Sequence, residues 1–303
     1  MTVLLLALAL DLALGDPRNR WHPVAWVGAA LESGRRLLSG AGPSRLLVGG
    51  ALTVGAVALI AAGTAHGITR LLEPWPVLAL VVQAWLLKCA LSVRDLFGAV
   101  LRVRAALSRG DLTAARETLG TDLVSRPTAT LDAGLAGSAA VESLAENLTD
   151  SLVAPLCFYV LGGLPAAWAY RVVNTADAML GYRQGELEYL GKAAARLDDA
   201  LNWAPARLTA AAIVAGAALT DGSSRNAWRA LRRDGARTAS PNAGLTMAAM
   251  AGALGVTLRK PGYYTLGVGP SPDPRAIAGA CRVAAAAAGL AVALLALGRW
   301  ALG

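Results

Sequence analysis

Clustered carboxylates and amides lie between apolar segments in the second half of the chain, where they could bind a cation or accept a proton. If residues 140–155 are helical, Glu142, Glu146 and Asp150 recur every fourth residue and form one acidic stripe. Like charges at this spacing repel one another unless a cation lies among them. Asn147 lies beside the stripe. This pattern predicts metal binding or a cationic substrate, with a solvated helix face as the alternative.

A second polar segment, residues 170–207, combines carboxylates with amides and basic residues. Asn174 and Asp177 are three residues apart and share a helix face, whereas Asp198 and Asp199 form a carboxylate pair on a later helix. An aspartate pair near basic side chains is typical of magnesium–phosphate sites. Exposed i, i+4 charge pairing is the alternative. The same segment supplies the further candidates Tyr182, Arg183, Lys192, Arg196, Asn202 and Arg207.

Residues 237–256 combine a turn with an apolar helix of small residues. Ser240-Pro241-Asn242 is typical turn sequence, so we expect Ser240 or Asn242 to cap the helix that follows. The N-terminal amides of such a helix attract anions, and a plain helix cap is the alternative. The loop after the helix is expected to carry Lys260, Tyr263 and Tyr264.

Other common site signatures are absent from the sequence, which has no P-loop, no GxGxxG after a strand, no GxSxG and no HExxH. The three cysteines are dispersed in apolar sequence, so they predict neither a disulfide framework nor a zinc site. The two histidines are too few for a histidine-rich metal site. A metal in this protein would therefore be held by oxygen, which favours magnesium.

The elements that position these clusters belong to a strongly apolar chain. Of its 303 residues, 55% are hydrophobic and 16% are charged, whereas soluble domains have about 25% charged residues. The net charge is +8, and the basic residues lie between apolar blocks rather than in basic runs. We therefore expect membrane flanks and anion contacts, not nucleic-acid binding, and the composition excludes disorder.

Several apolar stretches approach the length that a helix needs to cross a bilayer. We expect spans at residues 46–65, 76–93 and 283–302, with Gln83 and Lys88 of the second span facing a bundle interior. The N-terminal stretch 3–14 is expected to be a retained membrane segment because it contains Asp11 and lacks a basic leader.

Three further apolar stretches are short or interrupted, namely residues 151–170, 205–220 and 244–256. The first contains Pro155, Gly162, Gly163 and Pro165, which a straight helix tolerates poorly. Broken or re-entrant elements around a site are expected here, with simple short spans as the alternative.

The arginine distribution gives a partial topology. The loops 16–45 and 94–150 carry five and six arginines and are expected to be cytoplasmic. The sequence thus predicts an all-α, polytopic integral membrane protein whose broken or re-entrant helices surround a cytoplasm-facing site. We expect a single domain over residues 1–303, with an amphipathic helical cytoplasmic section at 94–150 and the motif-bearing catalytic region at 140–260.

Taken in order, these motifs resemble those of the CobD/CbiB family of adenosylcobinamide-phosphate synthases. The resemblance begins with DLALGDP and HPVAWVG, continues through AVESLAEN, AYRVVNTADAMLGYR and AARLDDALNWAPARLTA, and ends with SPNAG and MAAMAGALGV. The chain departs from the family pattern at Thr238-Ala239, at Ser151 and in the residues that follow Arg126.

The resemblance implies an enzyme of cobalamin biosynthesis in the prokaryotic cell (inner) membrane. Such an enzyme joins adenosylcobyric acid to (R)-1-aminopropan-2-ol phosphate, or to free aminopropanol, through an amide bond, with ATP as co-substrate and Mg²⁺. The implied partners are the corrinoid, aminopropanol phosphate and membrane lipid, with no nucleic acid. Close packing of the small-residue helix at 244–256 suggests a homodimer. The alternatives are a non-catalytic membrane carrier or scaffold for corrinoid intermediates, and a lipid-diphosphate transferase, for which a second aspartate-rich motif is missing.

With this resemblance, the polar clusters take expected roles. The expected catalytic residues are Glu142, Glu146, Asn147 and Asp177, of which Glu142 or Glu146 would receive or deprotonate the substrate ammonium. The expected substrate- and phosphate-binding residues are Asn174, Tyr182, Arg183, Lys192, Arg196, Asn202, Arg207, Ser240 and Asn242. The expected metal ligands are Asp150, Asp198 and Asp199.

Overall fold

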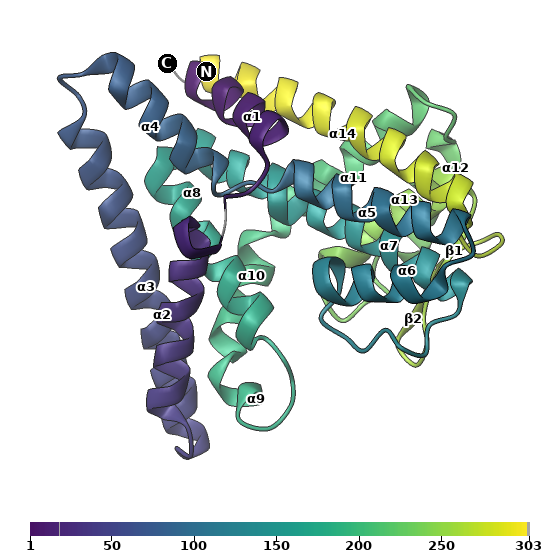
Figure 1. Ribbon diagram of the computed structural model, residues 1–303, viewed down its shortest axis with the longest axis horizontal. Coiled ribbons are helices and arrows are strands. Elements are labelled where there is room, and N and C mark those ends of the chain that lie inside the picture. The colour runs from purple at the N-terminus through teal and green to yellow at the C-terminus, as the bar shows by residue number, and fades with distance from the viewer. Residues whose placement is uncertain (18, 302–303) are drawn as a thin grey trace. The chain divides into compact units, whose positions relative to one another are not determined.

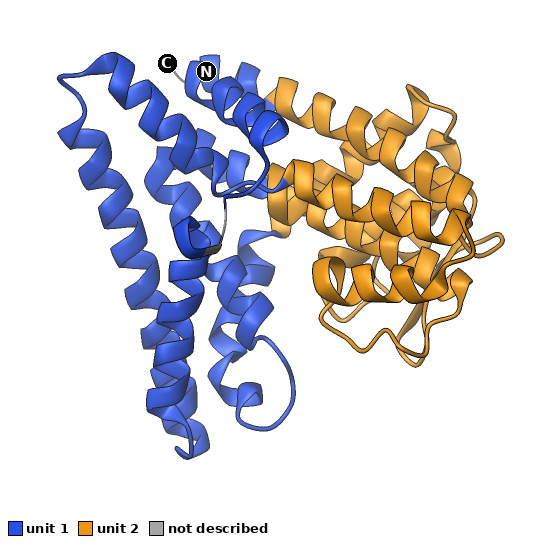
Figure 2. Ribbon diagram, viewed as in Figure 1, with its two compact units in different colours: residues 1–92, 154–202, 295–303 blue, residues 93–153, 203–294 orange. Residues whose placement is uncertain are grey.

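The computed structural model describes residues 1–17 and 19–301, and helices account for most of them (Figure 1). These residues form two compact units, which are interleaved along the sequence (Figure 2). Unit 1 contains residues 1–92, 154–202 and the chain end from 295, and unit 2 contains residues 93–153 and 203–294. The unit boundaries at 153/154 and 202/203 each lie directly beside one of the polar motifs.

Unit 1 is built from helices of very different length. Its elements are α1 (Thr2–Leu14), the 3₁₀ turn η1 (Asn19–Trp21), α2 (Pro23–Leu38), α3 (Pro43–Leu71), α4 (Pro76–Lys88), α8 (Ala154–Leu180), α9 (Leu187–Leu190) and α10 (Lys192–Leu201). Within this unit α3 packs along α8, and α1 packs against α4. α3 also packs against α9, and Gly50 makes this contact close, because a Cβ at this position would collide with the backbone carbonyl of Leu190.

Unit 2 surrounds a buried helix of small residues. Its elements are α5 (Val93–Ser108), α6 (Leu112–Thr118), the π-helical turns η2 (Leu119–Leu123) and η3 (Thr149–Val153), α7 (Ala133–Leu148), α11 (Trp203–Ala218), α12 (Ser224–Asp234), α13 (Ala243–Leu254), β1 (Thr257–Lys260), β2 (Tyr264–Gly267) and α14 (Pro274–Ala301), whose end belongs to unit 1. Within this unit α13 packs against α7, α11 and α12, and its residues from Thr246 to Ala253 are buried.

Four helical stretches in the described part of the chain are long and apolar enough to cross a membrane, namely Pro43–Leu71 (α3), Pro76–Ser108 (α4 and α5), Ala133–Leu180 (α7, η3 and α8) and Pro274–Trp300 in α14. They contain the expected spans, apart from the last two residues of 283–302, of which residue 302 lies outside the described residues. The second span includes Lys88, which is fully buried as expected. The prediction of an all-α polytopic membrane protein is confirmed.

The predicted interruption of the segment 151–170 is present. Within α8 the backbone leaves the helical region at Gly162 and Gly163, and Gly163 has a φ of 66°, which a glycine adopts without strain. Pro165 follows two residues after Gly163, where the missing N–H falls at the break instead of inside a regular helix. The kink therefore has an identifiable cause in the sequence.

One expected loop is instead a β-hairpin. The strands β1 and β2 pair antiparallel, with Leu258 opposite Leu266, and both of these leucines are fully buried. The turn between them contains Pro261 and Gly262, and Gly262 has a φ of 78°. Four-residue strands carry little periodicity, so the hairpin depends on burial of this leucine pair, which the sequence pattern does not reveal.

Candidate functional site

The expected residues of unit 1 meet in a hydrogen-bonded network centred on Asp198. Asn174 Nδ2, from α8, donates to Asp198 Oδ1 at 3.3 Å, and Asn202 Nδ2 donates to Asp198 Oδ2 at 3.0 Å. Both amides are oriented from behind, because Arg171 donates to Asn174 Oδ1 at 3.2 Å and Tyr170 Oη donates to Asn202 Oδ1 at 3.0 Å. The carboxylate is thus held in one orientation by donors from two helices.

The surroundings of Asp198 disfavour the ionised form of its carboxyl group. Burial raises the pKa of this carboxyl, and the neighbouring charge of Asp199 raises the pKa further, whereas the bonds from Asn202 and Asn174 lower it. Asp199 itself is only partly buried. A nearby cation would relieve both the burial cost and the repulsion between the two aspartates.

The remaining candidates of unit 1 lie on α8, on α10 and in the loop before α9. Arg183 and Arg196 are exposed, and Tyr182 and Asp177 are partly buried. Lys192 Nζ lies 3.0 Å from Glu188 Oε1 and 5.5 Å from the centre of the Tyr189 ring. Lys192 is therefore engaged by its neighbours, whereas Arg183 and Arg196 present their guanidinium groups to solvent.

A second network, in unit 2, surrounds Glu142. Ser138 Oγ donates to Glu142 Oε1 at 2.7 Å, and Tyr264 Oη donates to Oε2 at 3.1 Å. Arg126 Nη2 lies 3.5 Å from the same Oε2 atom. Ser138 also accepts the backbone N–H of Arg259 at 2.6 Å, which ties α7 to β1. Glu142 is 5% exposed, so its charge is compensated inside the unit rather than by water.

The other members of the predicted acidic stripe differ in accessibility. Glu146 lies one turn after Glu142 and is exposed, and its charge contributes, after burial and Glu142, to the raised pKa of Tyr264. Asn147 Nδ2 donates to the Ser143 carbonyl at 2.9 Å. Asp150 lies in the π-helical turn η3, beside Thr149, whose buried Oγ1 has no hydrogen-bond partner. Turns of this kind are frequent at functional sites because they redirect side chains.

The other predicted binding residues of unit 2 are Arg207, Ser240 and Asn242. The Arg207 guanidinium stacks 4.1 Å from the centre of the Trp203 ring and donates to the Trp203 carbonyl at 2.7 Å. The predicted side-chain cap of α13 is wrong, because Asn242 precedes the helix with αR backbone angles and makes no cap hydrogen bond. Ser240 Oγ instead accepts the N–H of Asn242 at 3.3 Å and closes the preceding turn.

The oxygen donors of Asp198 and Asp199 suit a divalent cation that also contacts a substrate. No group of three His, Cys, Asp or Glu side chains that could hold a metal occurs within residues 1–17 and 19–301. Magnesium in phosphate-transfer sites is usually held by one or two carboxylates, with water and substrate phosphates as its other ligands, so a pair is sufficient. Asp150 belongs to the other unit, and its role as a ligand stays a prediction.

Several side chains that organise these networks are not distinguished by the sequence motifs. Tyr170 and Arg126 act through contacts with residues 32 and 16 positions away in the chain, and Ser138 bonds residues 4 and 121 positions away. A third cluster was also missed, in which Asp16 lies 3.2 Å from Lys88 Nζ and accepts from Ser92 Oγ at 2.9 Å. His22 Nε2 lies 3.5 Å from the same Asp16 carboxylate. The motifs DLALGDP and HPVAWVG contain Asp16 and His22 and offered the available signal.

Comparisons with known proteins agree along almost the full chain. The family model described as CobD/Cbib protein matches residues 4–295. A probable cobalamin biosynthesis protein CobD of Methanothermobacter thermautotrophicus is 45% identical over 88% of this chain and 86% of its own length. Cobalamin biosynthesis proteins CobD of Dehalococcoides mccartyi and Geobacter metallireducens are 41% and 42% identical over 88% and 86% of this chain, and over 86% and 82% of their own lengths. No solved structure matches the chain.

Proposed function

The chain belongs to the CobD/CbiB family, and from this membership and the Asp198 network we propose that it is the amide-bond-forming synthase of its pathway. Its relatives are named for cobalamin biosynthesis, and the protein takes part in that process. The proposed reaction joins the carboxylate of adenosylcobyric acid to the amine of (R)-1-aminopropan-2-ol phosphate, or of free aminopropanol. The proposed location is the cell membrane, with the site facing the cytoplasm.

The observation that carries the proposal is the buried carboxylate of Asp198, which is held in one orientation although its surroundings disfavour its charge. Asp198 is held by two amides beside Asp199, and this pair would hold Mg²⁺ together with phosphate oxygens of ATP. The bound ion would neutralise phosphate charge during activation of the substrate carboxylate. Arg183 and Arg196, exposed in the same unit, would bind phosphate groups through charge-assisted hydrogen bonds.

The amine must lose a proton when it forms the amide. In the proposed sequence the substrate carboxylate takes the γ-phosphoryl group of ATP, and ADP leaves. The amine nitrogen then attacks the carbonyl carbon of this acyl phosphate, the C–N bond forms, and phosphate leaves with the electrons of the broken C–O bond. We assign proton acceptance to Glu146, because it is exposed, whereas Glu142 is buried and held by Ser138, Tyr264 and Arg126. Glu142 is then a positioning residue, because its bond to Tyr264 joins α7, which carries Glu146, to β2.

The direct test is an end-point assay on detergent-purified protein. The assay contains adenosylcobyric acid, aminopropanol phosphate and Mg·ATP, with each component omitted in turn, and the corrinoid product is detected by mass spectrometry. We expect product only in the complete mixture. If the protein binds the corrinoid but forms no product, the synthase proposal fails and the carrier reading replaces it.

Single substitutions test the role proposed for each residue. Glu146→Gln should lower turnover by about 10²- to 10⁴-fold if Glu146 is the base. Tyr170→Phe removes the donor that orients Asn202 and should lower activity by about 10- to 100-fold. Two matched controls, Glu73→Gln in unit 1 and Asp221→Asn in unit 2, alter exposed ion pairs and should keep full activity. A Glu146→Gln protein with normal turnover would exclude this residue as the base.

A further inference from the structure

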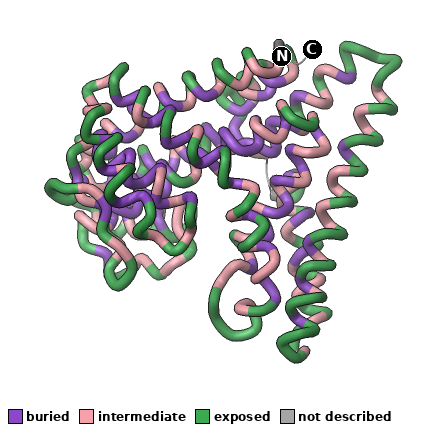
Figure 3. The backbone as a smooth tube through the Cα atoms, turned by 180° about the vertical axis from the view of Figure 1, so that it is seen from behind, coloured by how far each residue is buried: buried purple, intermediate pink, exposed green. Residues whose placement is uncertain are grey.

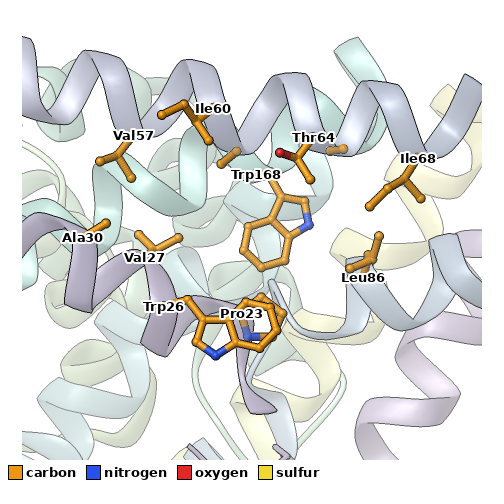
Figure 4. Close-up of a pocket in the computed structure, with 12 residues that line it drawn as sticks. Pro23, Trp26, Val27, Ala30, Val57, Ile60, Thr64, Ile68, Leu86 and Trp168 are labelled. Atoms are coloured by element: carbon orange, nitrogen blue, oxygen red, sulfur yellow. The ribbon is translucent and has the colours of Figure 1, made fainter. Parts of the chain in front are cut away.

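An apolar pocket of about 290 Å³ lies entirely within unit 1 (Figure 4). Four helices line it, and the side chains that matter here are Trp26 of α2, Ile60, Thr64 and Ile68 of α3, Leu86 of α4 and Trp168 of α8. No charged residue contributes to the lining. The occupant of this pocket must therefore present an uncharged, largely apolar surface.

Trp168 adds one directed polar group to this lining. Trp168 is only 5% exposed, and its Nε1 has no hydrogen-bond partner. Figure 4 shows the indole ring standing in the pocket beside Thr64. An indole N–H is a donor only, and buried tryptophans normally find an acceptor. The pocket thus lacks one hydrogen-bond acceptor, which the occupant can supply.

The pocket opens onto the part of α3 that faces lipid. The apolar window of this span has a mean hydropathy of 2.2 and is only 17% buried. Ile60, which lines the pocket, is itself 68% exposed, and its neighbour Leu59 is 76% exposed. Figure 3 shows exposed residues along most of α3. Because these exposed apolar side chains belong to a membrane span, the molecules next to the pocket are membrane lipids.

Trp168 stands beside Thr64 (Figure 4), which lies toward one end of the α3 span. Thr64 is seven residues before the end of α3 at Leu71, which is about 10 Å along the helix axis. Trp75 follows soon after and is 54% exposed, as is typical of residues at the membrane interface. From Thr64 the lining continues through Ile60 to Val57, toward the middle of the span. An acyl chain entering beside Trp168 would therefore run in the direction of the bilayer centre.

We propose that this pocket binds one acyl chain of a membrane phospholipid, whose ester carbonyl oxygen accepts the hydrogen bond from Trp168 Nε1. The volume agrees with this occupant, since about 150 Å³ of apolar cavity already holds a benzene molecule. A space of about 290 Å³ holds part of an acyl chain, whereas a corrin macrocycle with its side groups needs far more. The proposed lipid site therefore does not depend on the proposed function.

Native mass spectrometry of the detergent-purified protein, loaded with phosphatidylcholine and washed under fixed conditions, tests this site. Ala61→Phe fills the pocket from α3, and Ala51→Phe adds the same ring at an exposed position of the same helix as the control. We expect wild type and Ala51→Phe to retain one more phospholipid than Ala61→Phe. Equal lipid counts in all three proteins would overturn the proposal.

The hydrogen bond is tested by Trp168→Phe, which keeps an aromatic ring but removes the donor. The lipid-bound fraction should fall by roughly 2- to 10-fold, the effect of one neutral hydrogen bond. An unchanged fraction would overturn the assignment of Trp168 as the donor.

A second measurement does not depend on the folding of the filled variant. In nanodiscs of phosphatidylcholine with dibrominated acyl chains, bromine quenches tryptophan fluorescence at short range. The contribution of Trp168, taken as wild type minus Trp168→Phe, should be strong in unbrominated lipid and nearly lost in brominated lipid. Persistence of this contribution would show that no acyl chain enters the pocket.

Discussion

Lys88 Nζ lies 3.2 Å from Asp16 Oδ1, and this ion pair joins the end of α4 to the segment after α1. Lys88 is fully buried, whereas the Asp16 side chain is 24% exposed. The Lys88 ammonium also lies 5.5 Å from the centre of the Trp85 ring. The Lys88 ammonium therefore depends on Asp16 for compensation of its charge more than Asp16 depends on Lys88, because only Asp16 retains contact with water.

Asp16→Asn should destabilise unit 1 more than Lys88→Met does. Removing the carboxylate leaves a buried ammonium without its compensating charge, which costs about 3–5 kcal/mol. Lys88→Met removes the buried charge itself, and Asp16 keeps its bonds to Ser92 and His22. Thermal unfolding in detergent measures both variants, and the double variant should recover part of the loss. Equal destabilisation by the two single changes would contradict this asymmetry.

The same carboxylate predicts a pH dependence of stability. Burial opposes ionisation of Asp16, but hydrogen bonds from His22 and Ser92 and the charge of Lys88 outweigh it and lower the pKa to about 2. Because the pKa of the folded protein lies below the ordinary value of 3.8, the stabilisation is complete above that value and is lost as the pH falls toward 2. Melting temperatures of wild type should drop over this acidic range more steeply than those of Asp16→Asn.

Glu32 provides a matched comparison for this pH effect. Hydrogen bonds from Arg35 and Arg36 lower its pKa to about 2 as well, but this ion pair lies at the surface. Salt screens exposed pairs more than buried ones. High salt should therefore abolish the pH difference between wild type and Glu32→Gln, and should preserve the difference between wild type and Asp16→Asn.

The membrane helices could be predicted from sequence because length and hydropathy alone decide whether a helix can span a bilayer. The break in α8 was also predictable, since Gly162, Gly163 and Pro165 stand together in one apolar stretch. The hairpin β1–β2 was not, because its stability comes from burial of Leu258 and Leu266, a tertiary effect. The sequence pattern therefore predicts elements that are determined by their own residues, and it does not predict elements that depend on contacts with residues distant in the chain.

The candidate site shows the same division. The carboxylates and amides were predicted as members of motifs, but the pairing of Asn174 with Asp198 depends on how α8 and α10 pack. Glu142 was predicted only as one member of an acidic stripe, and its burial and its bond to Tyr264, which is 122 positions away, were not predicted. Helical spacing gives the face of a side chain, and it cannot give the partner that covers this face.

Ser138→Ala should destabilise unit 2 by about 1–3 kcal/mol. The hydroxyl both accepts from the Arg259 amide and donates to Glu142, so alanine leaves a buried donor and a buried carboxylate oxygen without this partner. Thr209→Val is the control, because its buried hydroxyl bonds only to a helical carbonyl four residues earlier, and its loss should cost less than about 1 kcal/mol. Chemical unfolding of both variants measures the difference, and a neutral Ser138→Ala would contradict the proposed link between α7 and β1.

Gly50→Ala should loosen the packing of α3 on α9, whereas Gly55→Ala on the same helix should not. A Cβ at residue 50 meets the backbone carbonyl of Leu190, which cannot rotate away, so the cost should be about 1–3 kcal/mol. A Cβ at residue 55 meets nothing within 4 Å, and the loss of glycine flexibility should stabilise the helix by about 0.5–1 kcal/mol. Melting temperatures in detergent should therefore move in opposite directions. A stabilising Gly50→Ala would mean that α3 and the Leu190 backbone are farther apart than described.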